Sequence, residues 1–281
     1  MEVVYAVAYA GGWPSLLARP MGLQGRFGVA THALRVRAGS DGRDGRGGRA
    51  PIRIAFASDF HAGPSTHPAL VRQACEALAE LRPDLLLLAG DFVAFHARHV
   101  ARLAPMLAAI EAPLGRFAVP GNHDLMADDA WVVRRLADAG VTTLVNANVR
   151  LPAPYDDVWV CGLDDQNQGA PDGAAALAGA DGTRLVLMHS PEGVRWLGGE
   201  EFAVGFCGHV HGGQFWLGGR ARTGHKGTFN QRYLRGGLFP PAPEHAGSLL
   251  VSRGIGQTSL PLRRHADPQV HLLTLELSSS A

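Results

Sequence analysis

The stretch Ile54-Ala55-Phe56-Ala57-Ser58-Asp59-Phe60-His61 decides the fold, because it joins a short apolar run directly to two chemically active side chains. The combination recurs four times, each time as an apolar run followed by Asp, Asn or His: 85–89 before Gly90-Asp91, 117–119 before Pro120-Gly121-Asn122-His123-Asp124, 185–188 before His189, and 204–207 before Gly208-His209-Val210-His211-Gly212-Gly213. In open α/β sheets, ligands bind where the carboxyl ends of the strands meet. We therefore expect the five polar clusters to form one site.

The spacing of apolar residues between these runs predicts helices. Strands are predicted at 52–57, 85–88, 116–119, 158–161, 185–188 and 203–207, and helices at 68–81, around 100–110, and from Asp128 or Asp129 to Gly140. Alternation of strands with helices is typical of βαβ units. The sequence thus predicts an α/β fold.

The composition describes a globular protein without a strong overall charge. The 281 residues are 46% hydrophobic and 18% charged, which excludes a chain disordered throughout. The net charge of +1, from 26 basic and 25 acidic residues, gives no general attraction for nucleic acid or anionic lipid. Cys75, Cys161 and Cys207 are odd in number and form no CxxC motif, so we expect neither a disulfide framework nor a thiolate zinc site.

The N-terminal region combines an uncharged run with an arginine-rich stretch. The run from Val3 to Ala18 is interrupted by Gly11-Gly12-Trp13-Pro14 and is shorter than the ~20 residues that span a bilayer. We therefore expect no transmembrane segment and a cytoplasmic protein, with peripheral contact at the inner membrane left open. Residues 35–53 contain six arginines without apolar periodicity, which predicts a loop. A nucleic-acid-binding arm is the alternative, but Asp41 and Asp44 dilute its charge and stacking aromatics are missing.

The residue types in the five clusters are metal ligands. Asp59-x-His61 and His209-x-His211 each place two donors on one side of an extended chain, and the neighbouring glycines allow the backbone to approach an ion closely. A single Asp or His after a strand is more often a turn residue or a solvated one, but five in equivalent positions favour a common site. The mixture of nitrogen and oxygen donors fits a pair of Mn, Fe or Zn ions better than calcium or magnesium.

These motifs, taken in order, resemble the complete motif set of the calcineurin-like metallophosphoesterases. The stretches 208–214 and 252–256 resemble the bacterial branch of YkuE- and YaeI-like phosphodiesterases, and the likeness extends over roughly residues 52–277. The resemblance implies a four-layer α/β/β/α sandwich of two mixed sheets with a dimetal site at one edge. It also implies that residues 1–50 are an N-terminal extension and Arg/Gly-rich linker, with room for an added edge strand, and that residues 51–281 are the metallophosphoesterase domain.

The resemblance also implies roles for individual residues. It assigns Asp59, His61 and His211 to the first metal, and Asn122, His189 and His209 to the second. Asp91 would bind both metals. His123 corresponds to the histidine that protonates the leaving group or stabilises the transition state. Many relatives orient this histidine with an acid three residues after the bridging aspartate, where this chain has Ala94. Asp124 is then the nearest candidate for that task.

The function implied is hydrolysis of a phosphodiester by a hydroxide that bridges two divalent ions, with Mn favoured over Fe or Zn. A small phosphoester or a lipid-linked nucleotide such as UDP-diacylglucosamine is the expected substrate. The alternatives are a phosphomonoesterase of the same fold and a non-catalytic metal-binding scaffold, and the intact ligand set argues against the scaffold. The near-neutral charge argues against a nuclease. No heptad or repeated apolar face indicates an oligomeric state.

Six cationic residues after the last metal motif permit two interpretations. They form either a clamp for substrate phosphate or an ordinary glycine-rich surface loop, and they are Arg220, Arg222, His225, Lys226, Arg232 and Arg235. Arg253, Arg263 and Arg264 are further candidates for anion binding, although pairing with backbone or carboxylate oxygens is the favoured interpretation.

Overall fold

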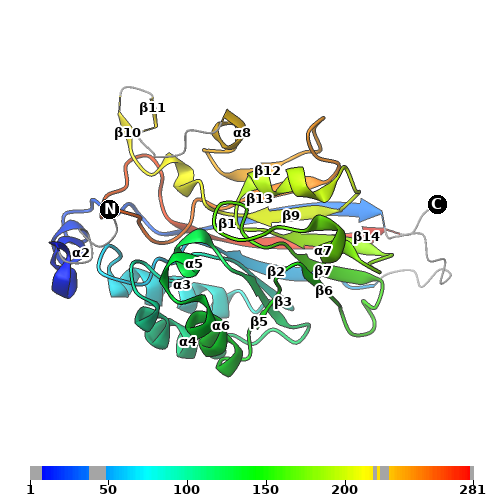
Figure 1. The fold of residues 1–281 in the computed structure, drawn as a ribbon, viewed down its shortest axis with the longest axis horizontal. Helices are drawn as coiled ribbons and strands as arrows, with labels where there is room; N and C mark the ends of the chain where they lie inside the picture. The colour runs from blue at the N-terminus through cyan, green and yellow to red at the C-terminus, as the bar shows by residue number, and fades with distance from the viewer. Residues whose placement is uncertain (1–7, 38–48, 218–219, 222–227, 279–281) are drawn as a thin grey trace.

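The computed structural model describes residues 8–37, 49–217, 220–221 and 228–278, and within them two six-stranded sheets form the centre of the molecule (Figure 1). The first sheet has the order β1 (Gly28–Arg37), β14 (Gln269–Ser278), β2 (Ile52–Ala57), β3 (Leu85–Ala89), β4 (Arg116–Val119) and β5 (Thr142–Thr143). The second has the order β12 (Gly237–Phe239), β13 (Ser248–Val251), β9 (Val204–Cys207), β8 (Thr183–Leu187), β7 (Val158–Gly162) and β6 (Ala147–Arg150). Strands β10 (Trp216–Leu217) and β11 (Arg220–Ala221) form a separate hairpin.

Both sheets are mixed. In the first, β2 to β5 are parallel, whereas β14 runs antiparallel to β2 and parallel to β1. In the second, β7, β8, β9 and β13 are parallel, and the outer strands β6 and β12 are antiparallel to their neighbours. The parallel strands are therefore the ones that converge on a common edge.

Side-chain alternation along the strands explains the layers. On β2, Ile54 and Phe56 point into the core between the two sheets, while Ala55 and Ala57 point to the opposite face. From the second sheet, Leu185 and Phe206 enter the same central core. A sheet that is apolar on both faces must be covered on both, so the two sheets pack face to face and helices close the outer faces.

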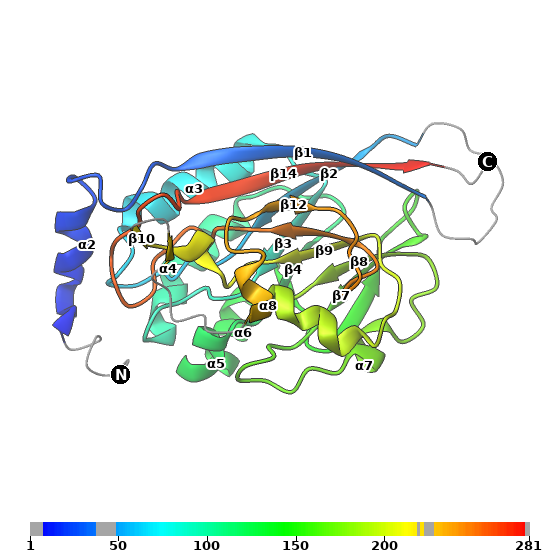
Figure 2. The ribbon, with the colours of Figure 1, turned by 90° about the horizontal axis from the view of Figure 1, so that it is seen from above.

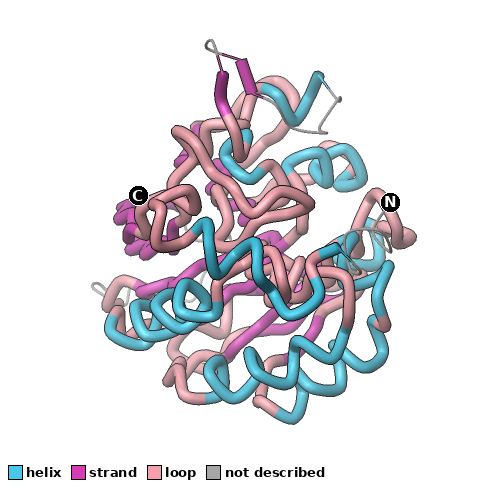
Figure 3. The backbone as a smooth tube through the Cα atoms, turned by 90° about the vertical axis from the view of Figure 1, so that its left-hand side faces the viewer, coloured by secondary structure: helices cyan, strands magenta, loops and turns pink. Residues whose placement is uncertain are grey.

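Each outer face is covered by its own helices. The first sheet is covered by α3 (Pro68–Glu80), α4 (Val100–Ala108) and α6 (Asp129–Asp138), on the lower side in Figure 1. The second is covered by α7 (Gly173–Leu177) and the 3-10 helix η3 (Pro191–Leu197), with α8 (Thr228–Gln231) nearby. Short helices at the loops are η1 (Ala10–Gly12), α2 (Trp13–Ala18), η2 (Ala97–His99), α5 (Asn122–Ala127) and η4 (His211–Gly213). Figure 3 shows these layers end on, and the predicted four-layer α/β/β/α sandwich is confirmed.

The N-terminal region contributes a strand to the first sheet. β1 pairs with β14 in parallel along its whole length, and the two strands lie side by side in Figure 2. The loop predicted over 35–53 is therefore wrong at both ends, because Arg35 and Arg37 belong to β1 and Arg53 to β2. Side chains at the end of β1 alternate between the two faces of the strand, which the arginine-rich composition does not show. Leu34 and Val36 pack against the central core, while Arg35 and Arg37 point outward. The part of this stretch from 38 to 48 lies outside the described residues. The division of the chain at residue 50 stays a prediction.

Other predicted elements match the structure within one to three residues. The carboxyl side chain of Asp128 caps α6 by accepting a hydrogen bond from the backbone N–H of Trp131 at 3.0 Å. None of the helices in the described part of the chain has the length and apolar character needed to cross a bilayer.

A buried histidine on β14 makes the fold sensitive to acid. The side-chain amide nitrogen of Gln269 lies 3.1 Å from Nε2 of His271, and because this amide nitrogen only donates, Nε2 accepts. The ring proton of His271 then lies on Nδ1, which is 3.2 Å from Nε2 of His32. Burial, with smaller effects of His32 and Arg253, lowers the pKa of His271 to about 3. His271 is therefore neutral in the folded protein.

We expect His271→Gln to reduce the loss of stability on acidification. Between the ordinary pKa of 6.5 and about 3, the unfolded chain binds a proton at this histidine and the folded protein does not, so stability falls as the pH is lowered. The variant should lose about 2 kcal/mol less than the wild type between pH 7 and pH 5. Urea unfolding of chelator-treated protein at both pH values measures this difference. His96→Gln, which alters an exposed histidine, should keep the wild-type slope, and an equal slope in all three proteins would contradict the assignment.

Candidate metal centre

The structure brings the seven predicted ligands together at the meeting edges of the two sheets. Asp59 and His61 follow β2, Asp91 follows β3, and Asn122 begins α5 just after β4, so these four come from the first sheet. The second sheet supplies the three remaining histidines, which follow β8 and β9: His189, His209 and His211. The ligands thus come from loops that the packing of the two sheets forces into one place.

Most of these residues have an unusual backbone conformation. A positive φ between 41° and 67° is found at five of the seven: Asp59, His61, Asp91, His209 and His211. For residues with a β-carbon this left-handed region is unfavourable, and it is maintained only where the surrounding structure fixes it. The conformation turns each chain sharply as it leaves its strand, which allows the side chains to converge.

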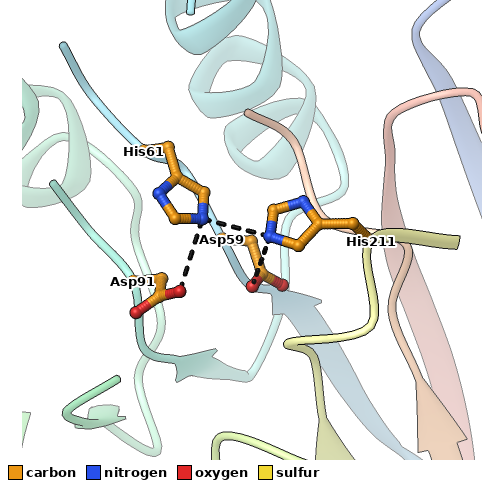
Figure 4. Close-up of side chains that lie close together, drawn as sticks. All are labelled: Asp59, His61, Asp91 and His211. Atoms are coloured by element: carbon orange, nitrogen blue, oxygen red, sulfur yellow. Dashed lines mark hydrogen bonds and ion pairs between the residues drawn. The ribbon is translucent and has the colours of Figure 1, made fainter. Parts of the chain in front are cut away.

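The first group of side chains contains two imidazoles and two carboxylates (Figure 4). The Nε2 atoms of His61 and His211 are 3.1 Å apart. Nε2 of His61 lies 3.3 Å from Oδ2 of Asp91, and Nε2 of His211 lies 3.4 Å from Oδ1 of Asp59. All four side chains are buried.

The second group shares Asp91 with the first. Nε2 of His189 lies 3.3 Å from the same Oδ2 atom of Asp91, 3.2 Å from Oδ1 of Asn122 and 3.1 Å from Nδ1 of His209. The Nδ1–H of His189 donates to the carbonyl oxygen of Ala89 at 2.8 Å. In the neutral ring, that bond places the proton on Nδ1 and directs the lone pair of Nε2 into the group, which is the form that binds a metal.

The spacing of these atoms fits divalent ions. Nitrogen and oxygen ligands lie 2.0–2.2 Å from zinc, so two ligands of one ion at tetrahedral or octahedral angles are about 2.9–3.6 Å apart. The distances of 3.1–3.4 Å in both groups fall in this range. Aspartate oxygens mixed with imidazole nitrogens suit Mn, Fe and Zn alike. The residues present therefore fit two ions that share Asp91.

Burial makes the electrostatics of the centre extreme. Burial opposes ionisation of Asp91, but the adjacent His189, His123 and His61 hold its pKa well below the usual range. Burial likewise opposes protonation of His189, yet Asp91 and neighbouring carboxylates raise its pKa well above the usual value. Burial raises the pKa of Asp59 to about 6 and lowers that of His61 to about 4. Such a dense set of desolvated charges is stabilised by cations placed among them.

His123 lies beside the centre in the first turn of α5. Its backbone N–H donates to Oδ1 of Asp91 at 2.9 Å, so this helix fixes the carboxylate oxygen that faces away from His61 and His189. The ring of His123 packs edge-on against that of His61, with the ring centres 4.7 Å apart. Its side chain is only partly buried, so a substrate at the centre can reach it.

The carboxylate of Asp124, the nearest candidate for orienting His123, accepts hydrogen bonds from the backbone. Oδ1 accepts from the backbone N–H groups of Phe92 and Val93 at 2.9 and 3.2 Å, and Oδ2 accepts from Gly121 at 3.0 Å. The carboxylate therefore holds the loop after Asp91 against the start of α5. Burial, with a contribution of Asp91, raises the pKa of Asp124 to about 7. A direct catalytic role of Asp124 stays a prediction, and its contacts favour positioning.

Glycines allow the carboxylates to sit against the backbone. A β-carbon at Gly121 would lie 2.3 Å from Oδ1 of Asp91. One at Gly208 would lie 2.3 Å from both Oδ2 of Asp59 and Oγ of Ser58. The backbone N–H of His209 donates to both oxygens of Asp59 at 3.1 Å. This close approach across the two sheets requires the absence of a side chain at residue 208.

Two further residues act on the centre, and the sequence interpretation missed both. The hydroxyl of Ser58 donates to Asp59. Asp165 is fully buried after β7, accepts from the backbone of Asn167 and Gln168 with Oδ1, and contributes to the raised pKa of His189. The pattern of an apolar strand followed by Asp, as in Gly162-Leu163-Asp164-Asp165, would have revealed it.

Arg263 illustrates the favoured alternative for the basic residues. Its buried guanidinium donates to the carbonyl oxygens of Arg253, Ala266 and His211 at 2.8, 2.8 and 3.3 Å, so it supports the loops around the centre. In the region proposed as a phosphate clamp, the guanidinium of Arg232 pairs with Glu244, and that of Arg235 stacks 4.0 Å from the ring centre of Trp216. Arg220 is exposed. Arg222, His225 and Lys226 lie outside the described residues.

The two-sheet frame and the shared aspartate define a candidate dimetal centre built from Asp, Asn and His side chains. The family model described as calcineurin-like phosphoesterase matches residues 52–213, and the chain belongs to this family. The matched residues include every predicted ligand.

Proteins with known names show the same relationship. Phosphodiesterase YaeI of Escherichia coli is 30% identical over 171 residues, which cover 59% of this chain and 62% of YaeI. Metallophosphoesterase YkuE of Bacillus subtilis is 28% identical over 205 residues, which cover 70% of this chain and 69% of YkuE. UDP-2,3-diacylglucosamine pyrophosphatase LpxG of Chlamydia trachomatis is 26% identical over 261 residues, with 73% and 78% covered. The match with YaeI thus spans about three fifths of that relative.

We expect Gly208→Ala to weaken metal binding, because the added methyl group would overlap Oδ2 of Asp59 and Oγ of Ser58. The affinity for Mn should fall at least about tenfold, and stability by about 1–3 kcal/mol. Isothermal titration of chelator-stripped protein with Mn measures the first and urea unfolding the second. Gly28→Ala is the matched control, since a β-carbon there meets nothing within 4 Å. Wild-type affinity in Gly208→Ala would show that Asp59 does not require this close approach.

Proposed function

We propose that this chain is a dimetal-dependent phosphodiesterase. The observation that carries the proposal is the position of a single atom, Oδ2 of Asp91, at 3.3 Å from Nε2 of both His61 and His189. This oxygen faces one histidine of each ligand group, so the carboxylate can serve two ions at once. His61 follows a strand of the first sheet and His189 a strand of the second.

In this proposal, each ion has three ligands of its own and shares Asp91. The residues are Asp59, His61 and His211 for one ion, and Asn122, His189 and His209 for the other. Two divalent ions held by these residues would polarise a phosphoryl group and lower the pKa of water between them. The neutral side chain of Asn122 makes the second set less negative than the first, which leaves the ion there more electrophilic.

His123 is the residue that we assign to the leaving group. Its partly exposed imidazole stands next to His61 at the edge of the centre, so it can donate a proton to the departing oxygen or hydrogen-bond to a phosphate oxygen. Its backbone is fixed by the hydrogen bond to Asp91, and Asp124 fixes the same turn through Gly121. The position of the imidazole is therefore coupled to the shared ligand through the backbone.

The expected substrate is a small or lipid-linked phosphodiester. The names of YaeI and LpxG support this, since one is a phosphodiesterase and the other a pyrophosphatase that acts on a nucleotide-linked lipid. UDP-diacylglucosamine is accordingly the first natural compound to test, and Mn the first metal. The cytoplasmic location, peripheral contact with the inner membrane and the oligomeric state stay predictions.

We expect chelator-stripped protein to hydrolyse bis-p-nitrophenyl phosphate only after Mn is added. Asp91→Asn should lower kcat/KM at least about a hundredfold, because the amide cannot supply an anionic oxygen to two ions. Asp138→Asn, which alters an exposed aspartate on α6, should leave the rate unchanged. The release of p-nitrophenolate measures all three rates, and the monoester p-nitrophenyl phosphate is assayed in parallel.

The alternatives give different results in the same assay. Preference for the monoester would indicate a phosphomonoesterase. Absence of turnover with both esters, while titration shows two Mn ions bound, would indicate a metal-binding scaffold. Either result would contradict the proposed phosphodiesterase.

A further inference from the structure

A cavity of about 550 Å³ lies beside the metal centre, between the N-terminal segment and the helices of the first sheet. Its walls come from residues 9–16 on one side and from α3, η2 and α4 on the other. Ala62 and Gly63, the two residues directly after His61, form part of the lining. The volume is within the ~300–1,000 Å³ that ligand pockets occupy. The cavity therefore begins next to a metal ligand and extends away from it.

The N-terminal wall is held in place by specific contacts. Gly12 lies next to Pro64, since a β-carbon built on Gly12 would be in ordinary van der Waals contact with Cα of Pro64 at 3.8 Å. Buried Gln24 donates to the carbonyl oxygen of Ser65 at 3.0 Å and accepts from the N–H of His67 at 3.2 Å. The segment that carries α2 is thus attached to the loop after His61. Figure 2 shows α2 at one end of the molecule, away from the sheets.

The lining combines an apolar wall with a cationic rim. Leu16, Val71, Leu103 and Met106 supply aliphatic surface, and Arg98 and Arg102 are exposed cations at the cavity. Among the described residues, no acidic side chain lines the cavity and no carboxylate forms an ion pair with either arginine.

The field of these cations also affects a histidine in the lining. Burial, followed by the charges of Arg98, His96 and Arg102, lowers the pKa of His99 to about 4. The rim is therefore positively charged without a compensating carboxylate among the described residues, as expected for a surface that meets an anion.

The outer face of α2 is apolar as well. Trp13 is 54% exposed, Leu17 57% and Met21 69%, and they stand on the same short segment as Leu16, which lines the cavity. Apolar side chains with neighbouring arginines are typical of surfaces that contact an anionic bilayer. The cavity and its surroundings thus offer an apolar surface and positive charges. These complement the apolar chain and the negative head of an anionic amphiphile.

We propose that this cavity binds the acyl chain of a lipid-linked phosphodiester whose phosphate lies at the metal centre, with Arg98 and Arg102 contacting negatively charged groups of the lipid. The inference rests on the proposed phosphodiesterase function and specifies its substrate class. Ala62, which follows His61 directly in the chain, forms part of the cavity lining, so in this proposal the acyl chain extends from the metal centre into the cavity.

The first test uses p-nitrophenyl phosphodiesters whose second alcohol is methanol, butanol or octanol, with the Mn-loaded protein. Each buried CH2 contributes about fourfold to binding, so kcat/KM should rise at least about tenfold from the methyl to the octyl ester. Leu16→Glu, at a residue 51% exposed, should abolish this rise and leave hydrolysis of the methyl ester unchanged. Leu17→Glu is the matched control, because it adds the same charge on the same helix outside the cavity lining, and it should retain the rise.

A second measurement does not depend on catalysis. Titration with cis-parinarate, a fluorescent fatty acid, should show saturable binding to wild type and Leu17→Glu, with at least about tenfold weaker binding to Leu16→Glu. The double variant Arg98→Glu/Arg102→Glu should also weaken binding, whereas Arg134→Glu, on an exposed part of α6, should not.

The outcomes separate this inference from the proposed function. Hydrolysis of all three esters without dependence on chain length, or an equal rise in Leu16→Glu and wild type, would overturn the inference and leave the phosphodiesterase intact. If the protein hydrolyses none of the three esters, the proposed phosphodiesterase function is contradicted. The substrate class inferred from that function is then contradicted as well. Parinarate bound equally well by Leu16→Glu would show that the acyl chain lies elsewhere.

Discussion

The carboxylate of Asp91 is the group on which the rest of the site depends. One of its oxygens is fixed by the backbone N–H of His123, and the other faces His61 from the first sheet and His189 from the second. The distance between the sheets is set by the apolar core between them, to which Phe56 and Phe206 contribute an edge-on ring contact at 5.3 Å. Packing in that core and geometry at the centre are therefore linked, because a change in sheet spacing would separate the two histidines from their shared oxygen.

The surrounding structure offsets the unfavourable free energy of this arrangement. Five ligands have left-handed backbones, and two desolvated carboxylates lie within one cluster of imidazoles. Both are local penalties of a few kcal/mol that only a rigid frame can maintain. Backbone N–H groups from His209 stabilise Asp59, Asp124 ties the loop of Asp91 to α5, and Arg263 connects loops from three parts of the second half of the chain. The frame around the ligands thus consists of hydrogen bonds within the chain itself.

The sequence predicts the strand ends well, and it predicts which side chains gather there, because apolar runs and the polar residues after them are local features. It does not show which hydrogen bonds a polar residue makes. Asp124 is the nearest candidate in the sequence for orienting His123. Its oxygens accept from the backbone N–H groups of Phe92, 32 residues earlier in the chain, and of Gly121, three residues earlier. Spacing along the sequence does not reveal such contacts. Strand β1 was hidden for a related reason. It is an edge strand with one exposed face, its last four residues alternate Leu34 and Val36 with arginine, and its partner β14 lies more than two hundred residues further along the chain.

The place of Ala94 shows how the chain accommodates a departure from the pattern of many relatives. Ala94 is 1% exposed, and a β-carbon at Gly63 would lie 2.9 Å from its carbonyl oxygen and 3.1 Å from its β-carbon. An acid at residue 94 would have to be buried against this loop, which also forms part of the cavity beside the centre. The methyl group of Ala94 therefore allows the loop after His61 to pack tightly against the loop after Asp91. His123 is positioned instead through its own backbone, by the N–H bond to Asp91 and the turn that Asp124 fixes, so its placement and that of the shared ligand change together.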